Sequence, residues 1–566
     1  MGTASTESWT TACRGIRDIM MLATAPEARC IGQPRLTAGL DRFRRIDLAG
    51  YHLVFGRLPR PPAGRLVEMA EQVDLRGRGG AAFPVARKLT AVLDAARTRK
   101  RTPIVLVNGA EGEPGSAKDR MLLLRSPYLV LGGALVAAQA LHARDILIGV
   151  ADPLAARSVR EAAAAEPSLR HMVGVVEVPD RFVSGESGAL VNAVNGRAAL
   201  PSADRTHNSY KGAGHRPTLL SNAETFAQLA ILAMVGPEGY ASAGTAAEPG
   251  TVLLTVGGAA ARPAVVEVPT GVSLGHALDL CGAGPADGVL VGGYHGCWVP
   301  EEAAYRVPVS RAELAAIGGT LGAGVVLALG RDSCPLGEVA RVAAFLAKES
   351  SGQCGPCKLG LPGIARSLAA LANGSGGVDA LDAARRGAAA VRGRGACSHP
   401  DGTFRFVLSA LNVFTDDLAA HLFHGGCGRP VREYLPAPSA ASEARLTVDW
   451  TRCQGHGLCA HIVPELVQRD RLGFPVLLDM PVPPWLERRA RQAVDRCPAL
   501  ALRLIPANPA PVTTSVQRKW LGRGRSHGPV ADTVPDLIVS EEWIAEISAA
   551  REPATGQAGG QRLSGR

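Results

Sequence analysis

Six of the chain's twelve cysteines fall into two local sets, and this clustering constrains the fold more than any other feature. The first set consists of Cys354, Cys357 and Cys397, and the second of Cys453, Cys459 and Cys497. The N-terminal residues lack the apolar stretch of a signal peptide, so we expect a cytoplasmic protein. Cysteines of cytoplasmic proteins stay reduced, so we do not expect a scaffold held together by disulfides. Local cysteine sets in such a chain indicate metal or redox chemistry.

Composition narrows the class of protein further. The 566 residues are 46% hydrophobic and 20% charged, which is typical of a soluble globular protein with about three to five domains. The formal charge of +10 is spread along the chain without a run of like charges, so we expect no nucleic-acid partner. The most apolar stretch, 129–141, is interrupted by two glycines and a glutamine. It predicts a buried helix rather than a membrane-inserted segment.

The residue pattern predicts a multidomain chain of the α/β and α+β classes. The expected parts are an N-terminal arm at 1–60, an α/β sandwich at 61–245, a small β-grasp-like module at 246–332, a helical region at 333–436, a compact module at 443–506 and a disordered tail at 507–566. A Pro-rich joint beginning at Leu435 separates the last two folded parts.

The compact C-terminal module contains Cys453-Gln-Gly-His-Gly-Leu-Cys459, with Cys497-Pro498 further along. Bacterial ferredoxins use C-x2-C-x2-C and a remote Cys-Pro, and His456 stands here at the middle position. The module therefore resembles single-cluster ferredoxins. Three thiolates suit a [3Fe–4S] cluster, and His456 as a ligand would allow a [4Fe–4S] cluster. A zinc site needs a fourth close ligand, and metal-free structural cysteines are the remaining alternative.

The other set begins Ser351-Gly-Gln-Cys354-Gly-Pro-Cys357, and Cys397 lies in a later Gly-flanked loop. This spacing alone allows zinc, a redox dithiol, an iron–sulfur cluster or a structural role.

A glycine-rich loop near the N-terminus contains Gly77-Arg78-Gly79-Gly80, followed by Lys88. The loop formally fits a Rossmann fingerprint, but the residues before it, 66–73, have a helical rather than a strand pattern. Its amides and its two cations suit a phosphate or a phosphorylated cofactor. A turn with incidental basic residues is the alternative.

Three further segments carry polar turns after apolar runs. They are the acidic turn 107–115, the segment 184–197 that begins Ser-Gly-Glu-Ser-Gly, and the segment 217–225. A strand that runs into such a turn can offer amide and carboxylate groups to a ligand at the sheet's C-terminal edge. Each segment alone is equally consistent with a surface turn.

Taken in order, these motifs and the Cys354 set resemble one family, the flavoprotein subunit of complex I (NADH-quinone oxidoreductase) and its hydrogenase and formate dehydrogenase relatives. The resemblance covers about residues 40–430 and implies an SLBB β-grasp domain, a helical iron–sulfur bundle and a cytoplasmic location. It implies an FMN held by Gly77, Arg78, Gly79, Gly80, Lys88, Asn108, Glu111, Gly185, Glu186, Asn222 and Thr225. It also implies a [4Fe–4S] cluster bound by Cys354, Cys357 and Cys397, with Glu111 and Glu186 positioning the hydride of NADH.

The chain departs from the family pattern at several positions. The first cluster cysteine is replaced by Ser351, which leaves a serine-ligated [4Fe–4S], a [3Fe–4S] or an unstable cluster, with Cys334 as a substitute if the fold brings it close. Two acids of the flavin loops are replaced by Ala110 and Ser187, and the aromatic stretch that packs on NADH is replaced by residues 204–210. These changes affect dinucleotide binding more than flavin binding.

We therefore predict an iron–sulfur flavoprotein oxidoreductase that passes electrons from NADH through FMN and the clusters to a redox partner or acceptor. The first alternative is an FMN enzyme of the same fold with a different donor or acceptor, which electrons enter through the ferredoxin module. The second is a catalytically silent scaffold.

Overall fold

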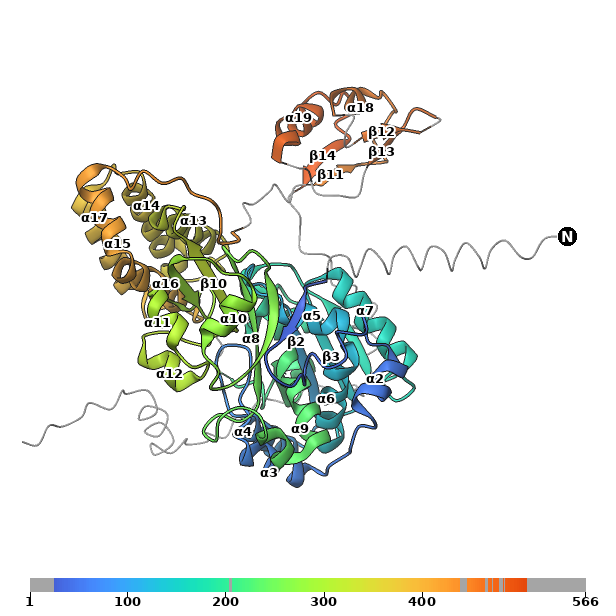
Figure 1. The fold of residues 1–566 in the computed structure, drawn as a ribbon. Helices are drawn as coiled ribbons and strands as arrows, with labels where there is room; N and C mark the ends of the chain where they lie inside the picture. The colour runs from blue at the N-terminus through green and yellow to red at the C-terminus, as the bar shows by residue number, and fades with distance from the viewer. Residues whose placement is uncertain are drawn as a thin grey trace, which may run out of the picture. The chain divides into compact units, whose positions relative to one another are not determined.

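The computed structural model describes residues 25–202, 206–437, 445–463, 467–470, 472–477, 482 and 484–505 (Figure 1). The tail at 507–566, for which the sequence predicts disorder, lies outside the described residues.

Four parallel strands form a sheet in the order β4-β3-β2-β5. They are β2 (Ile104–Gly109), β3 (Asp145–Val150), β4 (Val173–Glu177) and β5 (Thr218–Asn222). Side chains of β2 alternate between two cores, with Val105 and Val107 on one face and Ile104 and Leu106 on the other. Because helices cover both faces, the strands are apolar at nearly every position.

Helices on both faces make this part a three-layer sandwich. They are α3 (Ala63–Gln72), α4 (Val85–Arg99), α5 (Lys118–Arg125), α6 (Pro127–Ala140), α7 (Pro153–Ala165), α8 (Ser187–Val194) and α9 (Ala223–Ala241). Helix α6 is buried along almost its whole length, as the apolar stretch at 129–141 predicts. It packs against α9 so closely that a Cβ on Gly133 would lie 1.7 Å from the carbonyl oxygen of Phe226.

The described part of the N-terminal segment packs more firmly than the loose arm expected from its sequence. Strand β1 (Ala28–Cys30) joins a sheet beside β7, and α2 (Leu48–Phe55) follows. Leu36 and Ile46 are fully buried. The carboxylate of Glu267, also fully buried, accepts hydrogen bonds from the backbone N–H groups of residues 35–37 at 2.9–3.0 Å. The arm prediction is therefore wrong for this segment, because its short elements show no periodicity and are fixed by a carboxylate more than 200 residues away.

A six-stranded mixed sheet forms the second part, in the order β1-β7-β6-β10-β8-β9. Its other elements are β6 (Thr251–Gly258), β7 (Ala264–Pro269), α10 (Leu274–Leu280), β8 (Ala286–Val291), β9 (Cys297–Val299), α11 (Glu301–Arg306), α12 (Arg311–Ala316) and β10 (Val325–Gly330). Val326 and Ala328 of β10 enter the core of this sheet, whereas Leu327 and Leu329 enter the core of the helical region. One strand thus belongs to two cores.

The helical region contains five helices and a short π-helical turn at Pro356–Gly360. The helices are α13 (Pro335–Lys348), α14 (Leu361–Ala372), α15 (Gly377–Val391), α16 (His399–Val413) and α17 (Thr415–His424). After α17 the chain returns to the bundle, where Tyr294 donates a hydrogen bond to the carbonyl oxygen of Pro436 at 2.6 Å and Leu435 is fully buried.

The C-terminal module has a small core of its own. Two antiparallel pairs and two helices surround it: β11 (Arg445–Val448) with β14 (Leu502–Ile505), β12 (Val467–Arg469) with β13 (Pro475–Leu477), α18 (Leu458–Ile462) and α19 (Pro484–Asp495).

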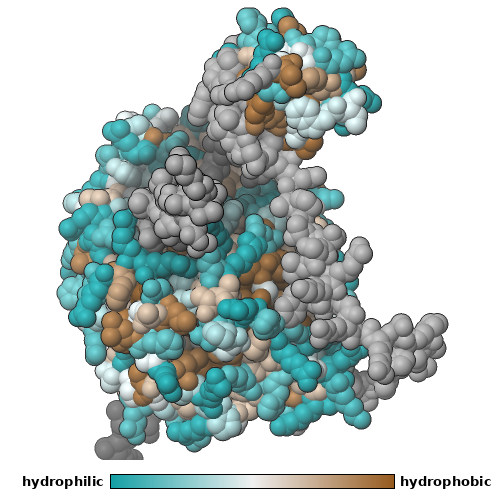
Figure 2. Space-filling view, turned by 90° about the vertical axis from the view of Figure 1, so that its right-hand side faces the viewer, coloured by the Kyte–Doolittle hydropathy of each residue, from teal (hydrophilic) through white to brown (hydrophobic). Residues whose placement is uncertain are grey.

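Within the described residues, no single helix is long and apolar enough to cross a membrane. Two bent pairs, α5–α6 and α16–α17, pass on length and composition only, as buried core helices also do. On the face in Figure 2, hydrophilic side chains surround separate hydrophobic areas.

We expect Gly133→Ala to lower the stability of the sandwich by about 1–3 kcal/mol, because the added methyl must push α6 away from α9. Urea unfolding followed by circular dichroism measures the change. Gly363→Ala in α14 is the matched control: its Cβ would meet only the end of Arg366 at 4.0 Å, and it should gain up to about 1 kcal/mol. Equal midpoints for the two variants would contradict the close packing of α6 on α9.

Candidate functional site

The predicted ligand-binding residues Asn108 and Asn222 lie side by side at the C-terminal ends of β2 and β5, where they are paired in register. The side-chain oxygen of Asn222 accepts a hydrogen bond from the N–H of Glu224 at 3.1 Å and caps α9. The amide of Asn108 donates to the carbonyl oxygen of Gly185 at 2.8 Å. Two strand ends and the loop before α8 therefore meet at the sheet edge where open α/β folds bind ligands.

The glycine-rich loop closes against this edge. The N–H of Arg78 donates to the hydroxyl of Thr225 at 2.9 Å. A Cβ on Gly79 would lie 3.3 Å from the Cβ of Asn222, and Gly80 has a φ of +95°. The fold thus brings Gly77–Gly80, Asn222 and Thr225 together, and the close approach of the loop to Asn222 favours glycine at position 79.

Two cations face the junction of β5 and α9. The ammonium of Lys88 donates to the carbonyl oxygen of Leu220 at 3.1 Å, and burial lowers its pKa. The guanidinium of Arg78, 8% exposed, lies 3.9 Å from Glu224 and donates to the carbonyl oxygen of Thr251 at 3.3 Å. A neutral carbonyl compensates a buried ammonium only in part, so an anionic ligand would stabilise Lys88.

Three buried polar atoms in these loops have no hydrogen-bond partner among the described residues. They are Nε of Arg78 and the hydroxyl oxygens of Ser184 and Ser221. Each lies in one of three segments that are predicted to bind the flavin: the glycine-rich loop, 184–197 and 217–225. Buried polar groups are nearly always satisfied, so these three atoms are available to a polar ligand with a phosphate group, such as FMN.

A buried ion network supports the edge, and the sequence did not predict it. The ammonium of Lys118 lies 3.0 Å from the carboxylate of Glu224, 3.1 Å from Asp119 and 3.0 Å from the side-chain oxygen of Asn222. Although burial alone lowers the pKa of Lys118, the charges of Asp119, Glu224 and Glu111 raise it above its ordinary value. The lysine is therefore charged and holds Asn222 in place.

Glu111, which the resemblance assigned to the hydride donor and the flavin, is engaged within its own loop. Its carboxylate accepts hydrogen bonds from the hydroxyl of Ser116 at 2.5 Å and from the N–H groups of Asp119 and Arg120. Burial first, then the charge of Asp119, raises its pKa to about 7. We therefore assign Glu111 to shaping the loop at the start of α5.

Glu186, the other acid predicted to position the hydride donor, is also engaged locally. It caps α8 by accepting from the N–H of Ala189 at 2.9 Å, and the hydroxyl of Ser187 donates to it at 3.0 Å. Its charge also raises the pKa of Cys397, so the carboxylate stands within electrostatic reach of the cysteine set.

Glu113 is a buried acid in the acidic turn that sequence reasoning passed over. Both of its oxygens lie 3.3 Å from the N–H of Tyr294, in the loop after β8. Burial raises the pKa of Glu113 to about 8. Position in the Gly-Glu-Pro-Gly turn was the available signal, but sequence alone could not show that another domain buries it.

The three cysteines of the helical region converge. Burial raises the pKa of Cys357, as does the charge of Cys354, whereas a hydrogen bond from the hydroxyl of Ser351 lowers it. The pKa of Cys354 is lowered overall: burial raises it, but hydrogen bonds from the backbone of Ala396 and Cys357 outweigh burial. Burial raises the pKa of Cys397 to about 11, assisted by the charges of the other two thiols. The predicted set of Ser351, Cys354, Cys357 and Cys397 is therefore assembled in space.

The segment that precedes α8 makes direct contacts with the segment that leads into this cysteine set. The N–H of Phe182 donates to the carboxylate of Glu349 at 3.1 Å, and the guanidinium of Arg181 lies 3.6 Å from the same carboxylate. Arg181 also donates to the carbonyl oxygen of Ser350 at 3.4 Å. These contacts lie three to four residues before Gly185 in one segment and one to two residues before Ser351 in the other.

The predicted ligands of the C-terminal module are also close together. Burial raises the pKa of Cys459, and the charges of Cys497 and Cys453 raise it further. The N–H of Ala501 donates to the sulfur of Cys497 at 3.4 Å. Gly455 and Gly457 have φ values of +70° and +72°, which let the loop turn around the thiols. His456, the alternative fourth ligand, is exposed in the same loop.

Two other expectations have different outcomes. Cys334 does not join the Cys354 set, because its neighbours are His421, Asp417 and Cys427. In the altered stretch, residues 203–205 lie outside the described residues, while the ring of Tyr210 lies under the guanidinium of Arg99 at 4.8 Å.

Comparisons with known proteins cover each of these parts. Residues 70–231 match the Nuo51 FMN-binding domain, 337–421 the iron–sulfur binding region of NADH-ubiquinone oxidoreductase F, and 446–504 a 4Fe–4S single cluster domain. The chain is 28% identical to the F subunit of NADH-quinone oxidoreductase of Mycobacterium tuberculosis over 410 residues, covering 68% of this chain and 90% of the relative. It is 26% identical to NADP-reducing hydrogenase subunit HndC of Solidesulfovibrio fructosivorans, covering 74% and 86%.

A solved structure agrees with the sequence comparisons. A chain of an NAD⁺-reducing [NiFe]-hydrogenase superposes with a TM-score of 0.61 at 26% identity, covering 70% of this chain and 68% of the other. The mixed α/β multidomain fold is thus confirmed. The chain is thus similar to the F subunit of NADH-quinone oxidoreductase over 68% of its length, and a match to a single-cluster 4Fe–4S domain follows the match to the iron–sulfur region.

Proposed function

We propose that this chain is an oxidoreductase that takes electrons from NADH at an FMN and delivers them through two iron–sulfur clusters to a redox partner. The observation that carries the proposal is the contact of Arg181 and Phe182 with Glu349 and Ser350. It holds the predicted flavin loop against the segment that leads into the cysteine set.

The residues fit the cofactors that the matched domains imply. The amides of the 77–80 loop, with Arg78 and Lys88, would hold the FMN phosphate, and Asn108, Asn222 and Thr225 would surround the flavin. Cys354, Cys357 and Cys397 would hold one cluster, and Cys453, Cys459 and Cys497 the other. When bound, FMN accepts a hydride as an electron pair and the clusters carry electrons singly.

The chain's own side chains supply position and electrostatics rather than acid–base catalysis. Lys118 fixes Asn222, and Asn108 fixes the carbonyl of Gly185, so the edge is organised before a ligand arrives. Glu186 would orient the hydride donor. The C-terminal module is covalently joined to the bundle, so an electron acceptor is always present at high local concentration.

The altered positions support a second candidate, an FMN and iron–sulfur enzyme with a different donor or acceptor. Ala110 and Ser187 remove two acids of the family pattern, and the ring of Tyr210 lies against Arg99. In that case electrons would enter through the C-terminal module. A scaffold without cofactors has no such observation in its favour.

Anaerobic addition of NADH to the purified chain tests the proposal. Prompt bleaching of both the flavin and the iron–sulfur absorbance is expected. Bleaching by dithionite but not by NADH would favour the second candidate, and a colourless, fully matured protein would favour the scaffold.

Glu186→Gln is expected to slow reduction by NADH at least about tenfold while FMN content and reduction by dithionite stay unchanged, since the amide oxygen can still accept the capping hydrogen bond from Ala189 and only the negative charge that would orient the donor is lost. Stopped-flow absorbance measures the rate. Glu177→Gln, at the exposed end of β4, is the matched control. A rate unchanged in both variants would remove Glu186 from the site.

Ser351→Cys is expected to stabilise the first cluster, because a thiolate is a softer ligand for iron than a hydroxyl that hydrogen-bonds to Cys357. Iron content and the lifetime of the cluster absorbance in air should both increase. A shorter lifetime would mean that Ser351 is the better ligand, and an unchanged lifetime would mean that it has no contact with the cluster.

Glu113→Gln tests the buried carboxyl. A carboxyl whose pKa is raised from 4.5 to about 8 contributes stability that is fully present below pH 4.5 and is lost as pH rises through 8. Glutamine cannot ionise, so the urea midpoint of the variant should rise relative to that of the parent between pH 5 and pH 8, and the difference should then level off. Fluorescence of freed FMN reports the midpoint, and a difference that is the same at every pH would contradict the burial of an ionisable Glu113.

A further inference from the structure

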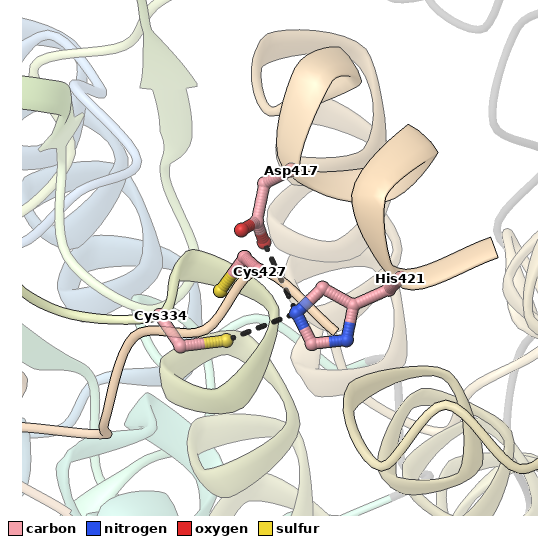
Figure 3. Close-up of side chains that lie close together, drawn as sticks. All are labelled: Cys334, Asp417, His421 and Cys427. Atoms are coloured by element: carbon pink, nitrogen blue, oxygen red, sulfur yellow. Dashed lines mark hydrogen bonds and ion pairs between the residues drawn. The ribbon is translucent and has the colours of Figure 1, made fainter. Parts of the chain in front are cut away.

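Four potential metal ligands meet in the helical region, outside both predicted cluster sites. They are Cys334, Asp417, His421 and Cys427, and their ligand atoms all lie within 4.8 Å of one another (Figure 3). Cys334, Asp417 and His421 are buried, and Cys427 is partly buried. Among the described residues, no other group of three or more histidine, cysteine or acidic side chains lies close enough together to share a single ion.

The ligands come from three segments. Cys334 follows β10 and caps the first turn of α13. Asp417 and His421 lie one turn apart on α17 and therefore share a face of that helix. Cys427 lies in the segment after α17. Figure 3 shows the side chains of all four converging between these segments.

The separations between the ligand atoms suit a tetrahedral ion. The sulfur of Cys334 lies 3.3 Å from Nε2 of His421, and that nitrogen lies 3.8 Å from the nearer oxygen of Asp417. Ligand atoms bound to zinc at about 2.0–2.3 Å in a tetrahedron lie about 3.3–3.8 Å apart. Only small side-chain movements are thus needed for binding.

Surrounding groups orient the ligands as metal sites require. Nδ1 of His421 lies 3.2 Å from the carbonyl oxygen of Leu371, which can only accept, so Nδ1 carries the proton and the lone pair of Nε2 faces the other ligands. The N–H of Gly337 donates to the sulfur of Cys334 at 3.2 Å, which holds this sulfur at the N-terminus of α13. The N–H of Leu336 donates to Asp417 at 3.1 Å.

We propose that Cys334, Asp417, His421 and Cys427 bind one Zn²⁺ ion. Two sulfurs, a ring nitrogen and a carboxylate oxygen make a closed, four-coordinate donor set with no position left for a substrate, which is the mark of a structural site. Binding forms four metal–ligand bonds and releases the two thiol protons to solvent, with no change of oxidation state.

Charge balance favours this assignment. Two thiolates and one carboxylate around a divalent ion leave a single negative charge in a buried position. The guanidinium of Arg429 donates to the other oxygen of Asp417 at 3.0 Å and offsets that charge. It also pairs with Asp287, whose side chain is more exposed than that of Asp417.

The ion would fasten the end of the bundle. It would join α17 and the segment that leads toward the C-terminal module to the junction of β10 and α13. Without an ion, a hydrogen bond between the thiol of Cys334 and His421 would satisfy the same atoms, and experiment distinguishes these two states. The proposal is independent of the donor and acceptor proposed above.

Metal analysis of the anaerobically purified full-length chain tests the site. About one zinc per chain is expected, falling to roughly a tenth in Cys427→Ser and His421→Gln, while iron content stays unchanged. Cys281→Ser, which alters a buried cysteine of the six-stranded sheet part, is the control and should retain zinc. Zinc can also occupy an incomplete iron–sulfur site, and Cys397→Ser tests whether the measured zinc lies there. If the zinc is bound by the proposed site instead, this variant retains it. Zinc lost in Cys397→Ser but kept in Cys427→Ser, or no zinc at all, would overturn the proposal.

A second measurement stays informative where a variant fails to fold. Chain stripped of zinc is titrated with Co²⁺, which gives intense visible bands in a tetrahedral site and a near-ultraviolet sulfur-to-cobalt charge-transfer band. Saturation at about one equivalent, reversed by added Zn²⁺, is expected. Weak octahedral bands without sulfur charge transfer would show that only a hydrogen-bonded cluster is present.

Discussion

The sheet edge at the C-terminal ends of β2 and β5, where we propose that the flavin binds (the flavin edge), depends on one buried ammonium group. Lys118 stands between two carboxylates and the side chain of Asn222, and these partners lie at the starts of α5 and α9. The carboxylate of Glu224 also accepts a hydrogen bond from the N–H of Leu253 in β6, so the same network ties the sandwich to the second sheet. Burying such charges is costly, and removing one partner typically costs about 3–5 kcal/mol. The arrangement therefore persists only as a complete set, which fixes the strand ends before a cofactor binds.

Strands that contribute side chains to two cores connect this edge to the other parts of the structure. Leu253 of β6 packs in the core of the sandwich, although its strand belongs to the second sheet. Strand β10, the neighbour of β6, sends alternate side chains into the core of that sheet and of the helical bundle. Shared strands thus connect the cores that carry the loop before α8 and the cysteine set, and the hydrogen bond from Phe182 to Glu349 joins the two segments directly. Electron transfer between fixed centres requires such positional stability.

Features that depend on short local motifs could be predicted from the sequence. The glycine-rich loop, the strand ends at Asn108 and Asn222 and both cysteine sets are short patterns in which residue type and spacing follow from the chemistry. Interactions between residues far apart in the sequence could not be predicted in this way. Lys118 pairs with Glu224, Glu113 is buried under Tyr294, and the N-terminal arm is held by Glu267. Cys334 and Cys427 belong to neither local cysteine set, and only the fold places them around His421.

The two main departures of the chain from its relatives are physically connected. Ala110 and Ser187 remove negative charge from the flavin edge, and Glu113 is protonated below pH of about 8. Fewer negative charges near the site would stabilise the reduced, more negative form of a bound cofactor. Onward transfer to a given acceptor is then less favourable. A second cluster on the same chain offsets this, because a tethered acceptor at high local concentration draws electrons away without waiting for a partner to dock.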